Sequence, residues 1–303
     1  MVNDAAPDRP TSRLDPASEA EAEAEAHRQI AQVDALATRH DALHQGRKVR
    51  WRRFGQDTSG PPLVLLHGGH GSWMHWLRNA PALSESRSVW VPDMPGFNDS
   101  DTPPEPIAGQ EPLAPTLELL AATLDQLVGP GTEIDLAGFS FGGFVASRLA
   151  LQRGRVRRLA LVGSAGHASM RRLSIEMINW RAAATREEER SALRHNLKAL
   201  MLHDEASIDA LAFVIHDVSC HGTRLRSKEV SLAGGLQATL DALSAEILLL
   251  WGEFDVTADP RPLLTQLLDG KPDRRGAIVE GAGHWAQLER AAAVNSLLID
   301  FLR

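Results

Sequence analysis

Residues 133–151 read EIDLAGFSFGGFVASRLAL, and in this stretch the pattern of a strand passes directly into that of a helix. Its first part, Glu133–Ala137, has the pattern of a short buried strand, and Phe144–Leu151 is compatible with a helix. The segment Gly138-Phe139-Ser140-Phe141-Gly142 joins the two. A serine on so tight a strand-to-helix turn projects from the end of its strand, and the glycines remove Cβ atoms that would clash there. The pattern therefore predicts a nucleophilic Ser140 at the carboxyl edge of a sheet.

Short apolar runs recur on both sides of this stretch. Such continuous runs suit strands that are buried on both faces of a parallel sheet. Patterns with helical spacing lie between them, and the clearest spans residues 117–128 and ends at Gly129-Pro130. The alternation predicts right-handed strand–helix–strand units and an α/β three-layer sandwich with a mostly parallel sheet. The apolar runs are Leu63–Leu66, Val89–Val91, Leu159–Val162 and Ile247–Leu250.

Two segments depart from this alternation. Residues 1–37 include Ser18–Ala26, SEAEAEAEA, in which alternating Glu and Ala leave no continuous apolar stripe. We therefore expect an N-terminal extension that is a frayed helix or disordered. Residues 166–240 look helical and lie between the sixth and seventh predicted strands, so we expect a helical lid at the edge of the sheet. The α/β core then comprises residues 38–165 and 241–303, and it opens with a hairpin around Gln45-Gly46-Arg47.

A serine hydroxyl is a weak nucleophile near neutral pH, so Ser140 needs a base. His284 ends the segment Gly281-Ala282-Gly283-His284, whose glycines let the loop bring the imidazole back to the carboxyl edge of the sheet. Asp255 follows another predicted strand and precedes the histidine in sequence. The order Ser, Asp, His is the one that accompanies a nucleophile elbow. Glu253 and Asp259 are neighbouring carboxylates and remain rivals for the role of Asp255.

A glycine-rich loop, residues 67–72, follows the predicted strand Leu63–Leu66. Its glycines allow the backbone to approach a substrate, so the candidate oxyanion donors are the backbone N–H groups of Gly69 and Phe141. His67, His70 and His75 lie in this region, but no acidic cluster accompanies them. We therefore expect no metal, and the chemistry requires no organic cofactor.

The composition of the chain excludes some classes of binding partner and indicates a cellular location. A formal net charge of −7 argues against a nucleic-acid partner. No apolar run approaches the roughly 18 residues of a membrane span, and Met1–Pro10 lacks the apolar stretch of a secretory signal. Cys220 is the single cysteine and cannot form an internal disulfide, which fits a reducing, cytoplasmic location. We expect a small-molecule partner and no membrane, leave a homo-oligomer open, and interpret Cys220 as a small buried hydrophobe.

Across residues 38–303 the chain resembles the α/β-hydrolase superfamily, whose lid corresponds to the helical insertion. Asp93-Met94-Pro95-Gly96-Phe97 is similar to that family's loop after its fourth strand. Gly283-His284-Trp285-Ala286-Gln287, with the closing helix, is similar to the meta-cleavage product hydrolases. The resemblance implies hydrolysis of a C–C bond in a vinylogous diketone formed during aromatic ring degradation. The lid stretch Met201–Arg226 is also similar, and this implies that Arg224 or Arg226 binds a substrate carboxylate.

One residue departs from that subfamily. Asparagine usually precedes its nucleophile, whereas this chain has Phe139, which cannot form a hydrogen bond with a dienol. The difference favours an ordinary ester or thioester with an apolar portion. Besides the two arginines, the residues expected to contact substrate are His70, Trp73, Phe139 and Trp285.

The sequence therefore leaves three functions open. The first is a serine hydrolase that acts through an acyl-enzyme on a small carboxylic ester. The second is a C–C bond hydrolase of a meta-cleavage product. The third, of another class, is a non-catalytic ligand receptor with the same fold, against which a complete Ser-His-Asp triad argues. Lyases and cofactor-free haloperoxidases also use this scaffold.

Overall fold

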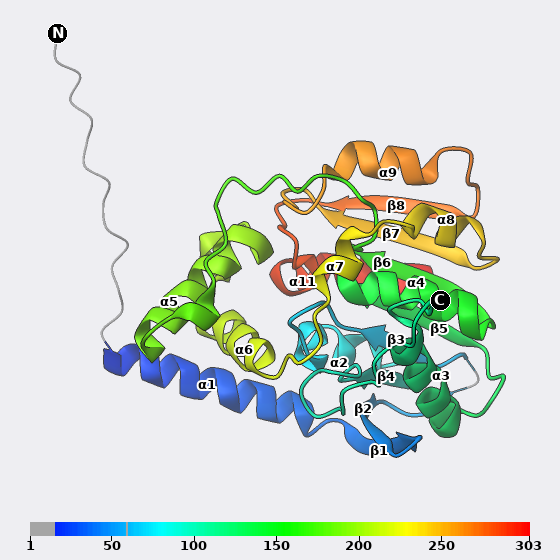
Figure 1. The fold of residues 1–303 in the computed structure, drawn as a ribbon, viewed down its shortest axis with the longest axis horizontal. Coiled ribbons are helices and arrows are strands. Elements are labelled where there is room, and N and C mark those ends of the chain that lie inside the picture. Colours follow the sequence, from blue (N-terminus) through cyan, green and yellow to red (C-terminus); the bar gives the residue numbers. More distant parts are fainter. Residues whose placement is uncertain (1–15, 59) are drawn as a thin grey trace, which may run out of the picture.

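An eight-stranded sheet forms the centre of the computed structural model, which describes residues 16–58 and 60–303 (Figure 1). The strand order is β1-β2-β4-β3-β5-β6-β7-β8. β2 pairs antiparallel with β1 and with β4, and every other neighbouring pair is parallel. The strands are β1 (Thr38–His44), β2 (Arg47–Phe54), β3 (Leu63–Leu66), β4 (Val89–Pro92), β5 (Ile134–Phe139), β6 (Val156–Val162), β7 (Glu246–Gly252) and β8 (Arg274–Val279).

Helices cover both faces of this sheet. α2, α10 and α11 pack on one face, and α3, α4, α8 and α9 pack on the other. β7 shows how the strands serve both layers, because Leu248 and Leu250 join the first apolar layer while Ile247 and Leu249 join the second. The predicted three-layer α/β sandwich is confirmed. The helices are α2 (Ala80–Leu83), α3 (Ala114–Val128), α4 (Phe141–Arg153), α8 (Leu236–Asp241), α9 (Pro260–Leu268), α10 (Ala286–Glu289) and α11 (Ala291–Leu302).

The hairpin that opens the core is tighter than expected. Gln45 and Gly46 alone form the turn, with φ angles of 50° and 74°, and Arg47 already belongs to β2. Two consecutive residues with positive φ match the turn that best suits the twist of paired strands.

The lid lies between β6 and β7. Its residues 163–179 contain neither helix nor strand, and α5 then begins at a capping box formed by Thr185 and Glu188. α8 packs against α4, so it belongs to the core although the predicted lid extends to residue 240. The lid elements are η2 (Trp180–Ala182), α5 (Arg186–Asn196), the π-helical turn η3 (Leu197–Met201), η4 (Glu205–Ser207), α6 (Ala210–His221) and α7 (Lys228–Leu232).

The N-terminal extension forms a continuous helix, α1 (Pro16–Asp34), which runs beside the lid helices α5 and α6 (Figure 1). The expectation of a frayed or disordered segment is wrong for these residues. Helical spacing places Ala26, Ile30 and Val33 on one face, and this face packs on the apolar layer beneath it. Residues 1–15 of the predicted extension lie outside the described residues.

Ion pairs fasten α1 at both ends. Near its start, Glu19 and Glu23 each pair with two arginines of α5, Arg190 and Arg194. At its end, Asp34 pairs with the buried Arg52 of β2 at 2.8 Å. α1 therefore connects the lid to the core. None of the helices in the described part of the chain is long and apolar enough to cross a membrane.

Candidate active site

Ser140 lies on the turn between β5 and α4, with φ 52° and ψ −119°. A residue with a Cβ pays a conformational cost for a positive φ, and such strain is typical of functional turns. The flanking glycines are required by packing. A Cβ on Gly138 would lie 2.3 Å from the carbonyl oxygen of Gly142, and one on Gly142 would lie 2.2 Å from that of His67. The turn thus holds Ser140 at the carboxyl ends of the parallel strands.

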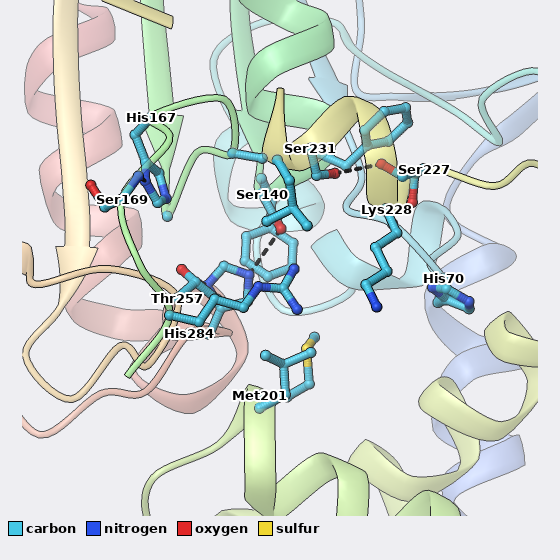
Figure 2. Close-up of a pocket in the computed structure, with 18 of the residues that line it drawn as sticks. His70, Ser140, His167, Ser169, Met201, Ser227, Lys228, Ser231, Thr257 and His284 are labelled. Atoms are coloured by element: carbon cyan, nitrogen blue, oxygen red, sulfur yellow. Dashed lines mark hydrogen bonds between the residues drawn. The ribbon is translucent and has the colours of Figure 1, made fainter. Parts of the chain in front are cut away.

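Three loops bring a hydroxyl, an imidazole and a carboxylate together at this edge. His284 Nε2 lies 2.9 Å from Ser140 Oγ, the contact drawn as a dashed line in Figure 2. On the other side of the ring, Nδ1 lies 2.8 Å from Asp255 Oδ2. Asp255 follows β7 and His284 follows β8, and both side chains are buried. The arrangement allows the imidazole to accept a proton from the hydroxyl while the carboxylate holds its Nδ1–H.

Thr257 fixes the orientation of Asp255. Asp255 Oδ1 accepts hydrogen bonds from the backbone N–H of Thr257 at 2.8 Å and from its hydroxyl at 2.7 Å. Burial alone would raise the pKa of Asp255, but the charge of His284 and the hydrogen bonds from His284 and Thr257 outweigh it and lower the pKa. The carboxylate therefore stays ionised near neutral pH.

The rival carboxylates have other partners. Glu253 accepts a hydrogen bond from the backbone N–H of Gly281 at 3.0 Å. Asp259 pairs with Arg172 at 3.2 Å. Neither contacts the imidazole of His284, whose Nδ1 faces Asp255.

The two candidate oxyanion donors are neighbours. A Cβ on Gly69 would lie 3.6 Å from the Cβ of Phe141, and both residues line the pocket beside Ser140. Phe141 begins α4, and the first N–H groups of a helix have no partner within it. Among the described residues, neither of these two N–H groups has a hydrogen-bond acceptor. They are therefore free to bind an oxyanion.

Two histidines hold the glycine-rich loop. His67 Nε2 accepts a hydrogen bond from the Met94 N–H at 2.9 Å, and its Nδ1 donates to the Gly68 carbonyl at 2.8 Å. His75 Nδ1 accepts from the Gly68 N–H at 3.2 Å. Burial lowers the pKa of His67 to about 4 and that of His75 well below its usual value, so both rings are neutral. Within residues 16–58 and 60–303, no three metal-ligating side chains form a group that could hold an ion.

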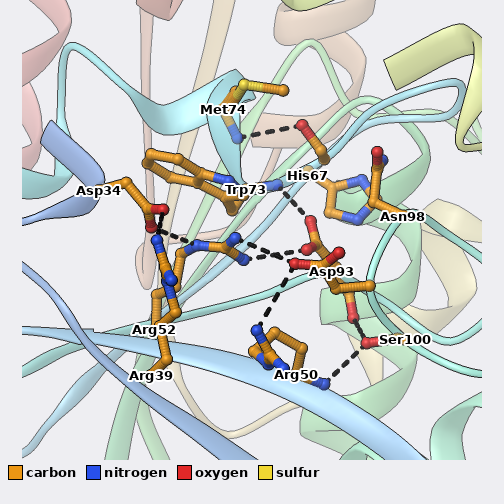
Figure 3. Close-up of polar contacts among 12 residues, drawn as sticks. Asp34, Arg39, Arg50, Arg52, His67, Trp73, Met74, Asp93, Asn98 and Ser100 are labelled. Atoms are coloured by element: carbon orange, nitrogen blue, oxygen red, sulfur yellow. Dashed lines mark hydrogen bonds and ion pairs between the residues drawn. The ribbon is translucent and has the colours of Figure 1, made fainter. Parts of the chain in front are cut away.

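A buried ion pair supports the segment that follows the loop (Figure 3). Arg52 pairs with Asp93 at 2.9 Å, and the other Asp93 oxygen accepts a hydrogen bond from the Trp73 N–H at 2.9 Å. The guanidinium of Arg52 also lies 4.6 Å from the ring centroid of Trp73. Burial raises the pKa of Asp93, although Arg52 opposes this effect. Trp73 is therefore part of a structural network and does not line the pocket, contrary to its expected contact with substrate.

A cavity of about 260 Å³ opens beside Ser140 under the lid (Figure 2). Of the residues expected to contact substrate, His70 and Phe139 line it. The Phe139 ring lies between the rings of His75 and His284, with centroid distances of 5.3 and 5.0 Å. The larger apolar side chains of the cavity come from both core and lid and are Phe139, Phe141, Met177, Leu200, Met201 and Leu232.

Three further expected substrate contacts lie outside this cavity. Trp285 is completely buried, and its indole N–H donates to the His75 carbonyl at 3.3 Å. Arg224 folds back on the core, where it donates to the Asn98 carbonyl at 3.0 Å. Arg226 is exposed and is not among the residues that line the cavity.

The site also contains residues that were not predicted from the sequence, among them Thr257, Lys228 and Arg171. Thr257 had a detectable signal, because a hydroxyl two residues after an aspartate is typical of a turn closed by the carboxylate. Lys228 and Arg171 lie in irregular or short elements of the lid. Hydrophobic periodicity gives no side-chain direction for such elements, so no comparable signal was present.

Known proteins resemble this chain in sequence and in structure. Residues 63–297 match the model of the alpha/beta hydrolase family. The 2-hydroxymuconate semialdehyde hydrolase of Pseudomonas sp. strain CF600 is 30% identical over 259 residues, which cover 80% of this chain and 87% of that protein. Naproxen esterase from Bacillus subtilis has a TM-score of 0.70 at 19% identity, covering 96% of this chain and 100% of the other. A meta-cleavage product hydrolase from Pseudomonas fluorescens IP01 has a TM-score of 0.65 at 22% identity, covering 86% and 96%.

Proposed function

The chain belongs to the alpha/beta hydrolase family, and we propose that it is a serine hydrolase that cleaves a small carboxylic ester through an acyl-enzyme. One observation carries the proposal. His284 is hydrogen-bonded to Ser140 Oγ at 2.9 Å and to Asp255 at 2.8 Å in one continuous chain. A hydroxyl aligned in this way with an imidazole and a carboxylate is activated for attack on a carbonyl carbon.

The proposed reaction uses only groups of this chain and water. Ser140 Oγ attacks the carbonyl carbon while His284 Nε2 accepts its proton, and Asp255 stabilises the resulting imidazolium. The backbone N–H groups of Gly69 and Phe141 bind the oxyanion, and each donor of this kind lowers the barrier by about 3 kcal/mol. His284 then protonates the leaving alcohol. In the second half of the reaction, His284 accepts a proton from water, which attacks the carbonyl carbon of the acyl-enzyme. His284 then returns the proton to Ser140 Oγ as the acyl group leaves as the carboxylic acid.

The second candidate is a C–C bond hydrolase that acts on a meta-cleavage product. It is favoured by the 30% identity to a 2-hydroxymuconate semialdehyde hydrolase. Phe139 favours the ester, because its buried ring precedes the nucleophile and offers no hydrogen bond to a dienol. A ligand receptor needs no aligned base behind Ser140, so the hydrogen-bonded triad supports an enzyme instead.

The test is a comparison of kcat/KM for 4-nitrophenyl hexanoate with that for a coloured dienol-diketone. We expect the ester to be the better substrate, and Ser140→Ala to reduce its turnover by at least about 10³-fold. Turnover of the dienol-diketone alone would favour the second candidate. Near wild-type ester hydrolysis by Ser140→Ala would refute the assignment of the nucleophile.

A further inference from the structure

The cavity beside Ser140 is lined by two basic side chains, Lys228 and Arg171, and by no carboxylate among the described residues. Besides the imidazole of His284, those of His70 and His167 also line it. Burial lowers the pKa of His70 and of His167, so neither of these two adds a positive charge near pH 7. The cavity thus has a local excess of positive charge on a chain whose formal net charge is −7.

Neither cation has a partner within the described part of the chain. No ion pair or side-chain hydrogen bond involves the Lys228 ammonium or the Arg171 guanidinium there, whereas the adjacent Arg172 pairs with Asp259 at 3.2 Å. Partial burial lowers the pKa of Arg171, and the charge of Asp255 only partly opposes this. Both residues are exposed to solvent for much of their surface, so each cation is free to pair with a negatively charged ligand that enters the cavity.

Lys228 is well placed to reach such a ligand. It is the first residue of α7 and follows Ser227, whose Oγ would lie 2.6 Å from a Cβ on Gly69. The start of α7 therefore rests on the glycine-rich loop that supplies an oxyanion donor. Figure 2 shows the Lys228 amine directed into the space bounded by Ser140, His70 and Met201. A long flexible side chain from this position can meet an anionic group several atoms away from the reacting carbonyl.

We infer that the pocket selects esters that carry a carboxylate group, which Lys228 and Arg171 bind while the apolar side chains of the cavity contact the rest of the substrate. This inference rests on the proposed function. Charge-assisted hydrogen bonds to a carboxylate in a partly closed pocket favour the charged substrate by about tenfold per cation. The carboxylate can lie on the acyl side or on the alcohol side of the ester, and the same two cations serve either.

Two matched pairs of esters test the inference. Mono-4-nitrophenyl adipate is paired with 4-nitrophenyl hexanoate, so the carboxylate lies on the acyl side. The second pair, 4-carboxyphenyl hexanoate and its methyl ester, places it on the leaving group. For each ester, kcat/KM of Lys228→Met or Arg171→Met is divided by the wild-type value, which removes differences in intrinsic reactivity.

We expect Lys228→Met to lower kcat/KM for the carboxylate ester of at least one pair about tenfold more than for its neutral partner. Lys228→Arg should retain most of the preference, since it keeps the charge. Arg226→Met removes an exposed cation two residues away and should leave every ratio unchanged, which controls for the overall charge of the protein.

The outcomes separate the two proposals. A selective loss on the adipate pair or on the carboxyphenyl pair supports the inference and locates the carboxylate. Equal effects on charged and neutral esters in both pairs would overturn the inference while ester hydrolysis stands. If the wild-type enzyme hydrolyses none of the four esters, the proposed function and the inference both fail.

Discussion

Replacement of Asp255 by Asn changes the active site in a way that the structure specifies. Asn has nearly the shape of Asp, but it presents one acceptor oxygen and one NH2 donor. Asp255 Oδ1 accepts two hydrogen bonds from Thr257, at 2.8 and 2.7 Å. The Asn oxygen must therefore take this side, and its NH2 group must face His284 Nδ1. The imidazole then accepts at Nδ1 and carries its proton on Nε2, where it cannot accept the proton of Ser140.

The size of the effect follows from the loss of the base. An imidazole held in the wrong tautomer, without a carboxylate to stabilise its charged form, lowers kcat by roughly 10⁴-fold. This corresponds to about 5 kcal/mol of barrier. KM should change little, because Asp255 does not line the substrate cavity. Steady-state hydrolysis of 4-nitrophenyl hexanoate at neutral pH measures both constants, and nitrogen NMR of His284 reports its tautomer directly.

The neighbouring carboxylates provide matched controls. Glu253→Gln and Asp259→Asn make the same chemical change within four residues of Asp255, but neither side chain contacts His284. Both variants should retain wild-type activity, and circular dichroism should show that all three variants fold. The reasoning is refuted if Asp255→Asn keeps more than about a tenth of the wild-type kcat, or if either control loses activity to the same extent.

The remaining predictions concern stability. His67 and His216 are buried with pKa values of about 4, against 6.5 as the ordinary value. As the pH falls, the unfolded chain therefore binds protons before the folded chain does. The stability that these neutral histidines contribute is fully present above pH 6.5 and is lost toward pH 4, with a loss of about 1 kcal/mol per histidine near pH 5.5. Urea unfolding followed by tryptophan fluorescence measures this loss, and a flat profile would contradict it. Replacing Glu19 and Glu23 by Gln removes the ion pairs to α5 and should cost about 1 kcal/mol. Faster hydrogen exchange in α1 is expected, and unchanged exchange would show that these pairs do not hold the helix.

Much of the fold could be predicted because its core leaves a local pattern. Parallel strands buried on both faces produce continuous apolar runs, and each predicted run lies within or coincides with an observed strand. The resemblance to the α/β-hydrolase superfamily is likewise confirmed by the family match over residues 63–297. α1 was predicted wrongly because its stabilising partners are remote in sequence. Arg190 and Arg194 lie about 170 positions from Glu19 and Glu23, and no local pattern reveals such a pairing.

In the candidate site, too, some residues could be predicted from the sequence and others could not. Ser140, Asp255 and His284 each follow a strand, and strand ends meet at one edge of a parallel sheet, so sequence order alone indicated that they come together. The contacts of lid and packing residues depend on side-chain direction. Arg224, Arg226 and Lys228 lie within five positions of one another, yet only Lys228 lines the cavity. Trp285, next to His284, packs inward instead, where its indole finds the His75 carbonyl.

The most direct test of the account is the site of covalent labelling by a fluorophosphonate, which reacts with a serine only when a base activates it. Intact-mass measurement and peptide mapping should find one adduct, on Ser140, and none on Ser140→Ala. His284→Asn should label far more slowly than the wild type. An unlabelled wild-type protein, or an adduct on any other residue, would contradict the claim that His284 activates Ser140.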